Sequence, residues 1–393
     1  MNNYIKNATA LVIGCFFAIL LLFVFVILFA KSGIILKGAQ INSISSLKED
    51  PLVGYTYTPN MNLNYEDENG ERAIQINNMG FRSHDYNQKD IKSGKQRIIV
   101  LGDSFTIGLG ARMTFSDLLE NMLNNNGKKP VLVYNFGMPG YSSHNELGVL
   151  QKYGEDIRPK VVIVTFYLGN DFRDNLIPLS NLKIISGYLV NNVFTWADKK
   201  IILNDEELAK YVDIATEYKL TGYSMIQMIR VDKFGAQMTF IEKTVRQLSI
   251  SFPGIKSFTD YFKQKIPLGM LLSLNITVPE YYKVSDEEIK TTEVYLKEIR
   301  DESHKLNATL ILAIIPEHLS NDENLSKRQT IKQICERLGV SHVIDLFDYL
   351  KDDMDNYYLK SDDHLSQAGH SVVANGIVTY IHKHNLLEKS SLN

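Results

Sequence analysis

Apolar runs that alternate with amphipathic helical patterns constrain the fold of this chain more than any other feature. Three such runs, in residues 97–104, 131–137 and 160–171, lack the polar alternation of a half-exposed strand. Helical patterns separate them at residues 114–127 and 144–157. Strands that are apolar on both faces are typical of parallel sheets covered by helices on both sides. The alternation therefore predicts an α/β fold with a parallel sheet.

The same alternation returns in the last third of the chain. Ser285 with Glu288 has the spacing of a capping box, which predicts the start of a long helix. The elements expected after it are a strand at 308–316, a helix at 325–339, a strand at 342–347 and a closing helix at 366–385. We therefore expect residues 96–175 and 285–385 to form one sheet domain.

The amino-terminal residues 8–30 are apolar and carry no charge. A helix needs about 20 such residues to cross the hydrocarbon core of a bilayer. A cleaved signal peptide has a shorter apolar core and a small-residue cleavage site, which residues 28–30 do not offer. We expect a single-pass membrane anchor. The flanking Lys6, Lys31 and Lys37 do not decide its orientation.

Two further regions lie outside the strand and helix alternation. Residues 31–95 predict a tether followed by a small β-rich entry segment, with a hairpin turn at 66–70. Residues 176–284 break the alternation and predict an inserted cap or lid.

The net charge is −3, so no overall basic field favours nucleic acid as a partner. The two cysteines, Cys15 and Cys335, do not provide a disulfide framework.

Gly102-Asp103-Ser104 ends the first predicted strand of the sheet. In open α/β sheets this carboxyl edge is where ligands bind. A tight turn there exposes the Ser104 hydroxyl and leaves backbone N–H groups free to stabilise an oxyanion. A serine is a nucleophile only when a base takes its proton. Two interpretations remain: Ser104 is a nucleophile, or it caps the helix that follows.

Two more turns at this edge offer hydrogen-bond donors. Gly140, in residues 135–145, could offer its N–H to the same oxyanion or form an ordinary turn. Asn170 ends the third strand, and its side-chain amide can donate to an oxyanion. Asp171 and Asp174 are interpreted as turn or cap residues. No spacing of metal ligands or cofactor motif occurs, so we expect neither a metal nor a cofactor.

A base with its partner precedes the closing helix. Asp362 and His364 are two residues apart, so in an extended loop both face the same side. A carboxylate there would fix the tautomer of the imidazole. Asp363 is the alternative partner, and the loop could also be a polar helix entry capped by Ser366. His370 lies within the helix and is interpreted as a structural or surface residue.

Together these blocks resemble the SGNH/GDSL hydrolases, a family named for Ser, Gly, Asn and His. The resemblance covers residues 96–175 and 285–385. Residues 77–83 also resemble the segment that precedes the sheet in membrane-anchored bacterial members, some of which are associated with polysaccharide assembly. The blocks that carry the resemblance are Gly102-Asp103-Ser104, Gly140, Gly169-Asn170-Asp171 and Asp362-Asp363-His364.

The resemblance implies a flavodoxin-like α/β/α sandwich and acyl ester chemistry. It implies that Ser104 is the nucleophile and that His364 is the base, oriented by Asp362. It also implies an oxyanion hole from the backbone of Ser104, the backbone of Gly140 and the side chain of Asn170. Many members place the acid three residues before the histidine, where this chain has Ser361. The spacing of Asp362 is similar to that of the acetyltransferase-like branch.

We therefore expect a membrane-anchored serine esterase that removes acyl groups, above all O-acetyl groups, from a glycan. An O-acyltransferase that modifies a polysaccharide with the same triad is the first alternative. A catalytically idle glycan-binding or assembly subunit is the second. The resemblance favours an extracytoplasmic domain on the outer side of a bacterial inner membrane. Neither the exact substrate nor the oligomeric state follows from the sequence.

Overall fold

The computed structural model describes residues 40–41, 47–67, 70–125, 129–185, 188–191, 193–196, 199–217, 284–318, 321–360 and 364–387. The chain divides into two compact units, Met1–Gly38 with Ala215–Val278 and Ala39–Ile214 with Pro279–Asn393. The described residues belong almost entirely to the second unit, on which the following description concentrates. No helix of the described part is long and apolar enough to span a bilayer, and residues 8–30 lie outside that part.

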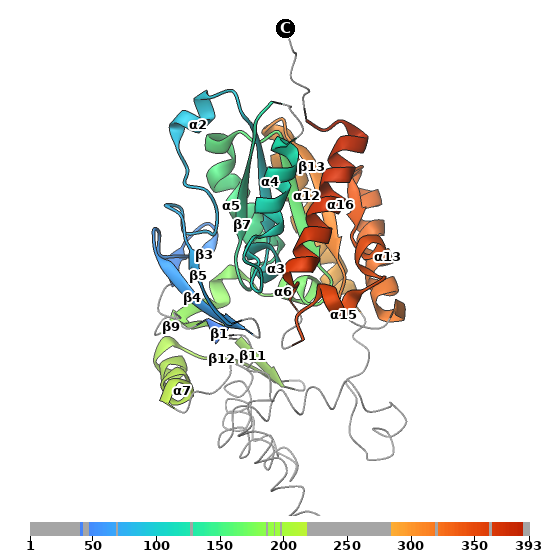
Figure 1. Ribbon diagram of the computed structural model, residues 1–393. Coiled ribbons are helices and arrows are strands. Elements are labelled where there is room, and N and C mark those ends of the chain that lie inside the picture. The colour runs from blue at the N-terminus through green and yellow to red at the C-terminus, as the bar shows by residue number, and fades with distance from the viewer. Residues whose placement is uncertain are drawn as a thin grey trace, which may run out of the picture. The chain divides into compact units, whose positions relative to one another are not determined.

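A five-stranded parallel sheet forms the centre of this unit (Figure 1). Its order is β14-β13-β8-β6-β7. If the five strands are numbered along the chain, this is the 2-1-3-4-5 order of flavodoxin-like folds. The predicted parallel sheet is confirmed. Its strands are β6 (Gln96–Gly102), β7 (Val131–Gly137), β8 (Val161–Tyr167), β13 (Thr309–Ile315) and β14 (Val343–Asp345).

Side chains of the central strands alternate between two hydrophobic cores, one on each face of the sheet. In β6, Ile98 and Val100 enter one core, whereas Ile99 and Leu101 enter the other. All four are fully buried. Because both faces bury apolar side chains, the strand has no polar alternation, which is the pattern that the sequence shows.

Helices cover both faces of the sheet. On one face α16 packs against α4, and on the other α12 packs against α5 and α13 (Figure 1). Capping boxes start three of them, with Thr114 before α4, Ser142 before α5 and Ser285 before α12. The bounds of these helices are α4 Phe115–Asn124, α5 Ser143–Ile157, α12 Asp286–Lys305, α13 Asn321–Leu338 and α16 Gln367–His384. Four one-turn helices lie between the strands and these helices: α3 (Ser104–Ile107), α6 (Asp171–Asp174), α14 (Phe347–Leu350) and α15 (Met354–Tyr357).

The entry segment folds into β-hairpins that share a core with the sheet. Tyr55, Tyr65 and Phe81 are each at most 1% exposed and join the core that also holds Ile99 and Leu101. The hairpin predicted at residues 66–70 is present, with Asp67 paired to Gly70. The elements of the entry segment are β1 (Gln40–Ile41), β2 (Leu47–Asp50), β3 (Gly54–Tyr57), β4 (Asn62–Asp67), β5 (Gly70–Gln75) and α2 (Gln88–Lys92).

Two small hairpins open the region of the predicted insert. β9 pairs with β10, and β11 pairs with β12, both antiparallel. A 3-10 turn precedes them and one helix follows; residues 218–283 lie outside the described part. The elements are η2 (Leu179–Asn181), β9 (Leu182–Ile185), β10 (Tyr188–Asn191), β11 (Val193–Trp196), β12 (Lys199–Ile202) and α7 (Asp205–Glu217).

Candidate active site

Ser104, Gly140 and Asn170 each follow a strand at the carboxyl edge of the parallel sheet. Ser104 follows β6 and Asn170 lies three residues beyond the end of β8, and these two strands are neighbours. The strand order reverses between them, since the connection after β6 runs outward to β7 and the next one returns to β8. Ligands of open α/β sheets bind at this kind of switch point.

Ser104 is the first residue of α3, and its side chain does not cap that helix. The cap is Asp103, whose carboxylate accepts the N–H of Phe105 at 2.9 Å. The alternative that Ser104 serves only as a helix cap therefore has no support in the geometry. Ser104 is half-buried, so its hydroxyl is accessible from the edge of the sheet.

Buried hydrogen bonds fix α3 to both neighbouring strands. The Thr106 hydroxyl is bonded to that of Thr165 in β8, which in turn donates to the Leu101 carbonyl at 2.9 Å. From β7, the Asn135 amide donates to the Thr106 carbonyl at 2.7 Å. Gly137 has no room for a side chain, because a Cβ there would lie 2.1 Å from the Ile107 nitrogen. Ser104 is thus carried by a short helix that cannot shift freely.

His364 lies against Ser104. Its Nε2 lies 2.7 Å from Ser104 Oγ, although 260 residues separate the two in sequence. A bridge between Tyr358 and Leu365 closes the loop that carries His364, and Leu359 donates its N–H to the His364 carbonyl at 2.8 Å. With a neutral imidazole protonated on Nδ1, Nε2 is positioned to accept the Ser104 proton.

The acid of the predicted triad is not among the described residues. Asp362 and Asp363 both lie in the gap at residues 361–363. The choice between them therefore stays a prediction. Ser366 does cap α16, since its hydroxyl accepts the Gly369 N–H at 3.2 Å. Ser366 and His364 are two residues apart and make separate contacts, Ser366 with the start of α16 and His364 with Ser104.

Asn170 is held by the carboxylate one helical turn later. Its Nδ2 donates to Asp174 Oδ2 at 2.6 Å, which occupies one of the two amide hydrogens and leaves the other for a ligand. Asp171 accepts the Tyr167 N–H at 2.8 Å. A Cβ at Gly169 would lie 2.3 Å from the Tyr167 ring. These contacts give Asp171 and Asp174 the local roles expected of them, and they give Asp174 control of the amide orientation.

Gly140 lies in a tight turn after β7. Residues 138–141 are closed by the Tyr141 N–H, which donates to the Met138 carbonyl at 3.1 Å. Met138 itself donates to the carbonyl of Gly102 at 3.2 Å, so the turn is tied to the residue two before Ser104. The φ angle of Gly140 is 78°, a left-handed conformation that favours glycine. No oxygen among the described residues accepts the Gly140 N–H, and Gly140 is an exposed residue.

Arg82 makes contacts beside the candidate site that the sequence did not predict. Its guanidinium donates to four carbonyls at the end of α3 and in the loop after it: Ile107 at 3.3 Å, Gly108 at 2.8 Å, Ala111 at 2.9 Å and Arg112 at 2.8 Å. The only sequence signal for Arg82 was the family resemblance of residues 77–83, which gave this residue no role. Arg82 thereby holds the loop that joins α3 to α4.

Buried acids surround the base of α3. Burial raises the pKa of Asp103 to about 6, although the Phe105 N–H and the charge of His364 act in the opposite direction. Burial, and next the charge of Asp103, raises the pKa of both Glu146 and Asp171 well above its usual range. These two carboxyls keep their protons to a higher pH than exposed carboxyls do.

His370 is structural. It is fully buried in α16, and its Nδ1 accepts the Phe115 N–H at 3.0 Å. Burial lowers its pKa to about 3, with the charges of Arg82 and His364 acting in the same direction. The imidazole is neutral at physiological pH and fixes the start of α4. It makes no contact with Ser104.

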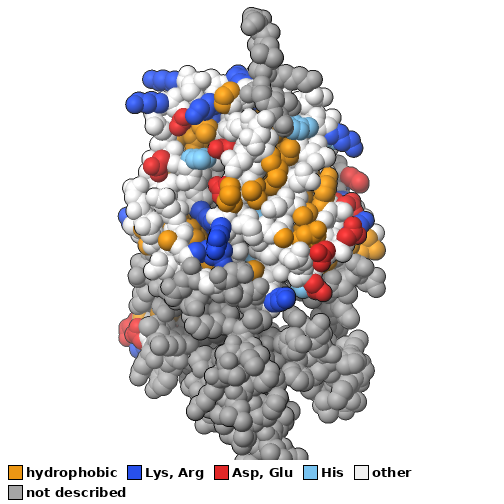
Figure 2. All heavy atoms as spheres, in the orientation of Figure 1, with side chains coloured by type: hydrophobic (Ala, Val, Ile, Leu, Met, Phe, Trp, Pro, Cys, Tyr) orange, Lys and Arg blue, Asp and Glu red, His pale blue; other side chains and the backbone are white. Residues whose placement is uncertain are grey.

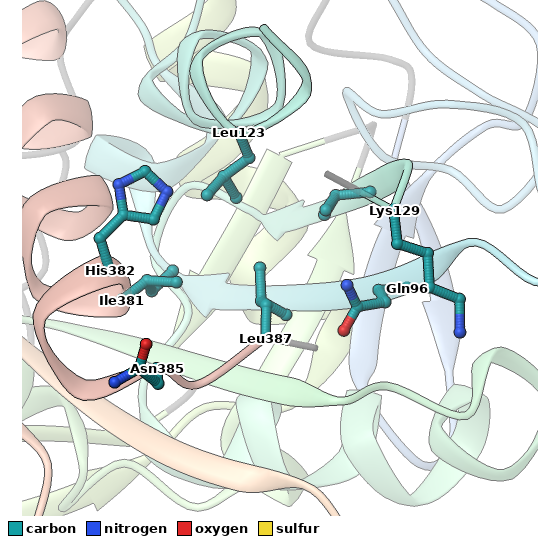
Figure 3. Close-up of a pocket in the computed structure, with 8 residues that line it drawn as sticks. Gln96, Leu123, Lys129, Ile381, His382, Asn385 and Leu387 are labelled. Carbon is teal, nitrogen blue, oxygen red and sulfur yellow. The ribbon is translucent and has the colours of Figure 1, made fainter. Parts of the chain in front are cut away.

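The pocket in Figure 3 is at the opposite edge of the sheet. Gln96, the first residue of β6, and Leu123 line it together with residues of the α16 terminus, and its volume is about 10 Å³. This is room for about one water molecule, which makes it a packing defect rather than a ligand site.

Figure 2 shows acidic and basic side chains interspersed on the viewed face, without a field of one sign.

No protein-family model and no curated protein sequence matches the chain. Solved structures similar to it include a lipase/acylhydrolase from Enterococcus faecalis, with 13% identity, a TM-score of 0.37, and coverage of 74% of this chain and 96% of that chain. A psychrotrophic esterase from Pseudoalteromonas sp. has 12% identity, a TM-score of 0.36, and coverage of 74% and 99%. An acetylxylan esterase from Geobacillus stearothermophilus has 12% identity, a TM-score of 0.36, and coverage of 73% and 95%. All three are ester hydrolases by name. Because identities and TM-scores are low, the assignment below rests on the geometry of the site.

Proposed function

We propose that the chain is a serine esterase of the SGNH type that removes ester-linked acyl groups through an acyl-enzyme on Ser104. The observation that carries the proposal is the 2.7 Å contact between Ser104 Oγ and His364 Nε2 at the switch point of the sheet. A half-buried serine bonded to an imidazole is the arrangement that activates a hydroxyl for attack. Asn170 and Gly140 carry donors at the same edge.

In the first half of the reaction, His364 Nε2 takes the Ser104 proton while Oγ attacks the ester carbonyl carbon. The carbonyl oxygen becomes an oxyanion, which the N–H groups of Ser104 and Gly140 and the amide of Asn170 stabilise. The intermediate collapses as the C–O bond to the alcohol breaks. His364 gives its proton to the departing oxygen, and the acyl group stays on Ser104.

In the second half, His364 takes a proton from a water molecule that attacks the acyl-enzyme. Collapse of the second tetrahedral intermediate breaks the bond to Oγ, and His364 returns the proton to Ser104. The acid leaves and the enzyme is restored. A transferase would use the same steps with a sugar hydroxyl in place of water. In this proposal the substrate is an O-acetylated glycan, a choice that rests on the resemblance of the sequence.

Acetate release from an acetylated polysaccharide tests the proposal. We expect the full-length chain to release acetate from acetylated xylan, and Ser104→Ala to release none above background. Mass spectrometry of an added, unacetylated oligosaccharide measures transfer in the same reaction. Free acetate without acetylated acceptor supports the esterase. If the acetylated acceptor is the main product, the chain is an O-acyltransferase rather than an esterase. A well-folded chain that neither releases acetate nor acetylates the acceptor would contradict both enzyme activities and favour the catalytically idle assembly subunit.

We further propose that residues 8–30 anchor the chain and that its catalytic unit lies on the outer side of the membrane. The uncharged apolar run supports the anchor, and the position of acylated glycans in bacteria supports the side. Protease added to intact spheroplasts should digest the catalytic unit. Digestion only after lysis would contradict the orientation. Release of the full-length chain by alkaline carbonate would contradict the anchor.

A further inference from the structure

We infer that Tyr55, in the entry segment, is a positioning residue of the oxyanion hole: its hydroxyl fixes the orientation of the Pro139–Gly140 peptide and hence of the Gly140 N–H. The inference rests on the proposed function, because it assigns this N–H to the oxyanion. Tyr55 belongs to β3, far from the four blocks in sequence. Nothing in the resemblance assigns it a role.

The contact that carries the inference joins Tyr55 to the peptide itself. The Tyr55 hydroxyl donates to the Pro139 carbonyl at 2.6 Å. No described peptide bond is cis, and in a trans peptide the C=O and N–H groups point in opposite directions. The Gly140 N–H therefore points away from Tyr55. Tyr55 is 1% exposed whereas Gly140 is exposed, so the N–H points away from the core.

The local sequence alone leaves that orientation adjustable. Residues 138–141 form a turn with proline and then glycine at its centre, and the φ angle of 78° at Gly140 is that of a type II turn. Types I and II differ mainly by a flip of the central peptide, which reverses its C=O and N–H. Glycine accepts both forms at low cost. The hydroxyl of Tyr55 stabilises the type II form, because only this form directs the Pro139 carbonyl toward it.

Tyr55 is itself held in place from two sides. The Tyr141 hydroxyl donates to the Tyr55 carbonyl, and the two rings meet edge to face with centroids 5.2 Å apart. Asn145 of α5 donates to the Val53 carbonyl at 2.8 Å, which fixes the start of β3. Burial raises the pKa of Tyr55 well above its usual value of 10, so the hydroxyl keeps the proton that it donates.

The expected consequence lies in the transition state. An oxyanion donor acts only when charge develops on the substrate oxygen, so loss of its orientation lowers kcat and leaves KM nearly unchanged. Tyr55→Phe keeps the ring and removes the hydroxyl. We expect kcat to fall by at least about tenfold, but by less than the roughly 10²–10³-fold loss that follows removal of a whole donor. The fall in kcat of Asn170→Ala, which removes a whole donor, is the upper limit for this comparison.

The experiment compares full-length variants in the hydrolysis of p-nitrophenyl acetate. Tyr134→Phe is the matched control, because it removes a buried hydroxyl that has no hydrogen-bond partner among the described residues. Rates are normalised to active sites titrated with a fluorophosphonate probe, and thermal unfolding is followed in parallel. A purely structural loss would reduce the number of titrated sites and the Tm but not the rate per site.

A reduced kcat per site in Tyr55→Phe, with KM and Tyr134→Phe unchanged, supports the inference. Equal kcat in the two variants would overturn it while the proposed function stood. A rise in KM alone would also overturn it, since that would place Tyr55 in ground-state binding. A wild-type chain that neither turns over the ester nor reacts with the probe would refute the proposed function and, with it, this inference.

Discussion

At the scale of single residues, the candidate site depends on side chains other than the proposed reacting groups. Asp103 caps α3 and so leaves the Ser104 hydroxyl free for His364. Asp174 takes one hydrogen of the Asn170 amide and thereby directs the other. Each bond restricts a group that the reaction needs in one orientation. Preorganised donors of this kind avoid the cost of reorienting during the reaction.

Glu146 allows a test of the buried acids by pH. Its folded-state pKa is raised by burial, so its contribution to stability is complete below its ordinary pKa of 4.5 and is lost as the pH rises toward the folded value. The free energy of unfolding should therefore fall between about pH 5 and about pH 8. Glu146→Gln cannot ionise, and its free energy of unfolding should fall less over this range.

Urea denaturation at the two pH values measures the difference. Glu155→Gln is the matched control, because Glu155 lies on the same helix, α5, and is exposed. It should follow the wild-type pH dependence. A Glu146→Gln protein that lost as much stability as the wild type between these pH values would show that Glu146 is not the group whose ionisation is unfavourable in the fold.

At the scale of elements, the sheet and its helices could be predicted because their signals are local. Apolar strands such as Ile98–Leu101 are buried on both faces, and the capping box at Ser285 is contained within four residues. The strands β9 to β12 have four residues each, too few for a period-two pattern to stand out. The sequence accordingly predicted an inserted cap or lid in that region, without naming any strand.

The roles of the entry segment could not be predicted, because they depend on contacts between distant parts of the chain. The bond from Tyr55 to Pro139 spans 84 residues, and those from Arg82 reach as far as Arg112. A buried tyrosine looks like core in any sequence pattern. Ser104 and His364 were found despite a still larger separation, because each lies in a recognisable motif. A motif thus indicated the reacting groups, but not the residues that orient them.

At the scale of the whole molecule, the entry segment and the sheet share one hydrophobic core. Ser104, Gly140 and Asn170 follow strands at the sheet edge, whereas Tyr55 and Arg82 contact the turns around them from outside the sheet. The turns of the candidate site are therefore held by contacts from both parts. A fragment that begins at β6 would lack contacts to the turns that carry Gly140 and follow α3.

The central claim is that Ser104 forms an acyl-enzyme, and rapid-mixing hydrolysis of p-nitrophenyl acetate tests it most directly. We predict a burst of p-nitrophenol equal to the concentration of titrated sites, followed by slower steady turnover, with an acetyl group on the Ser104 peptide after an acid quench. Ser104→Ala should show neither burst nor acetylation. A burst of the same size in Ser104→Ala, or acetylation at another residue, would contradict the account.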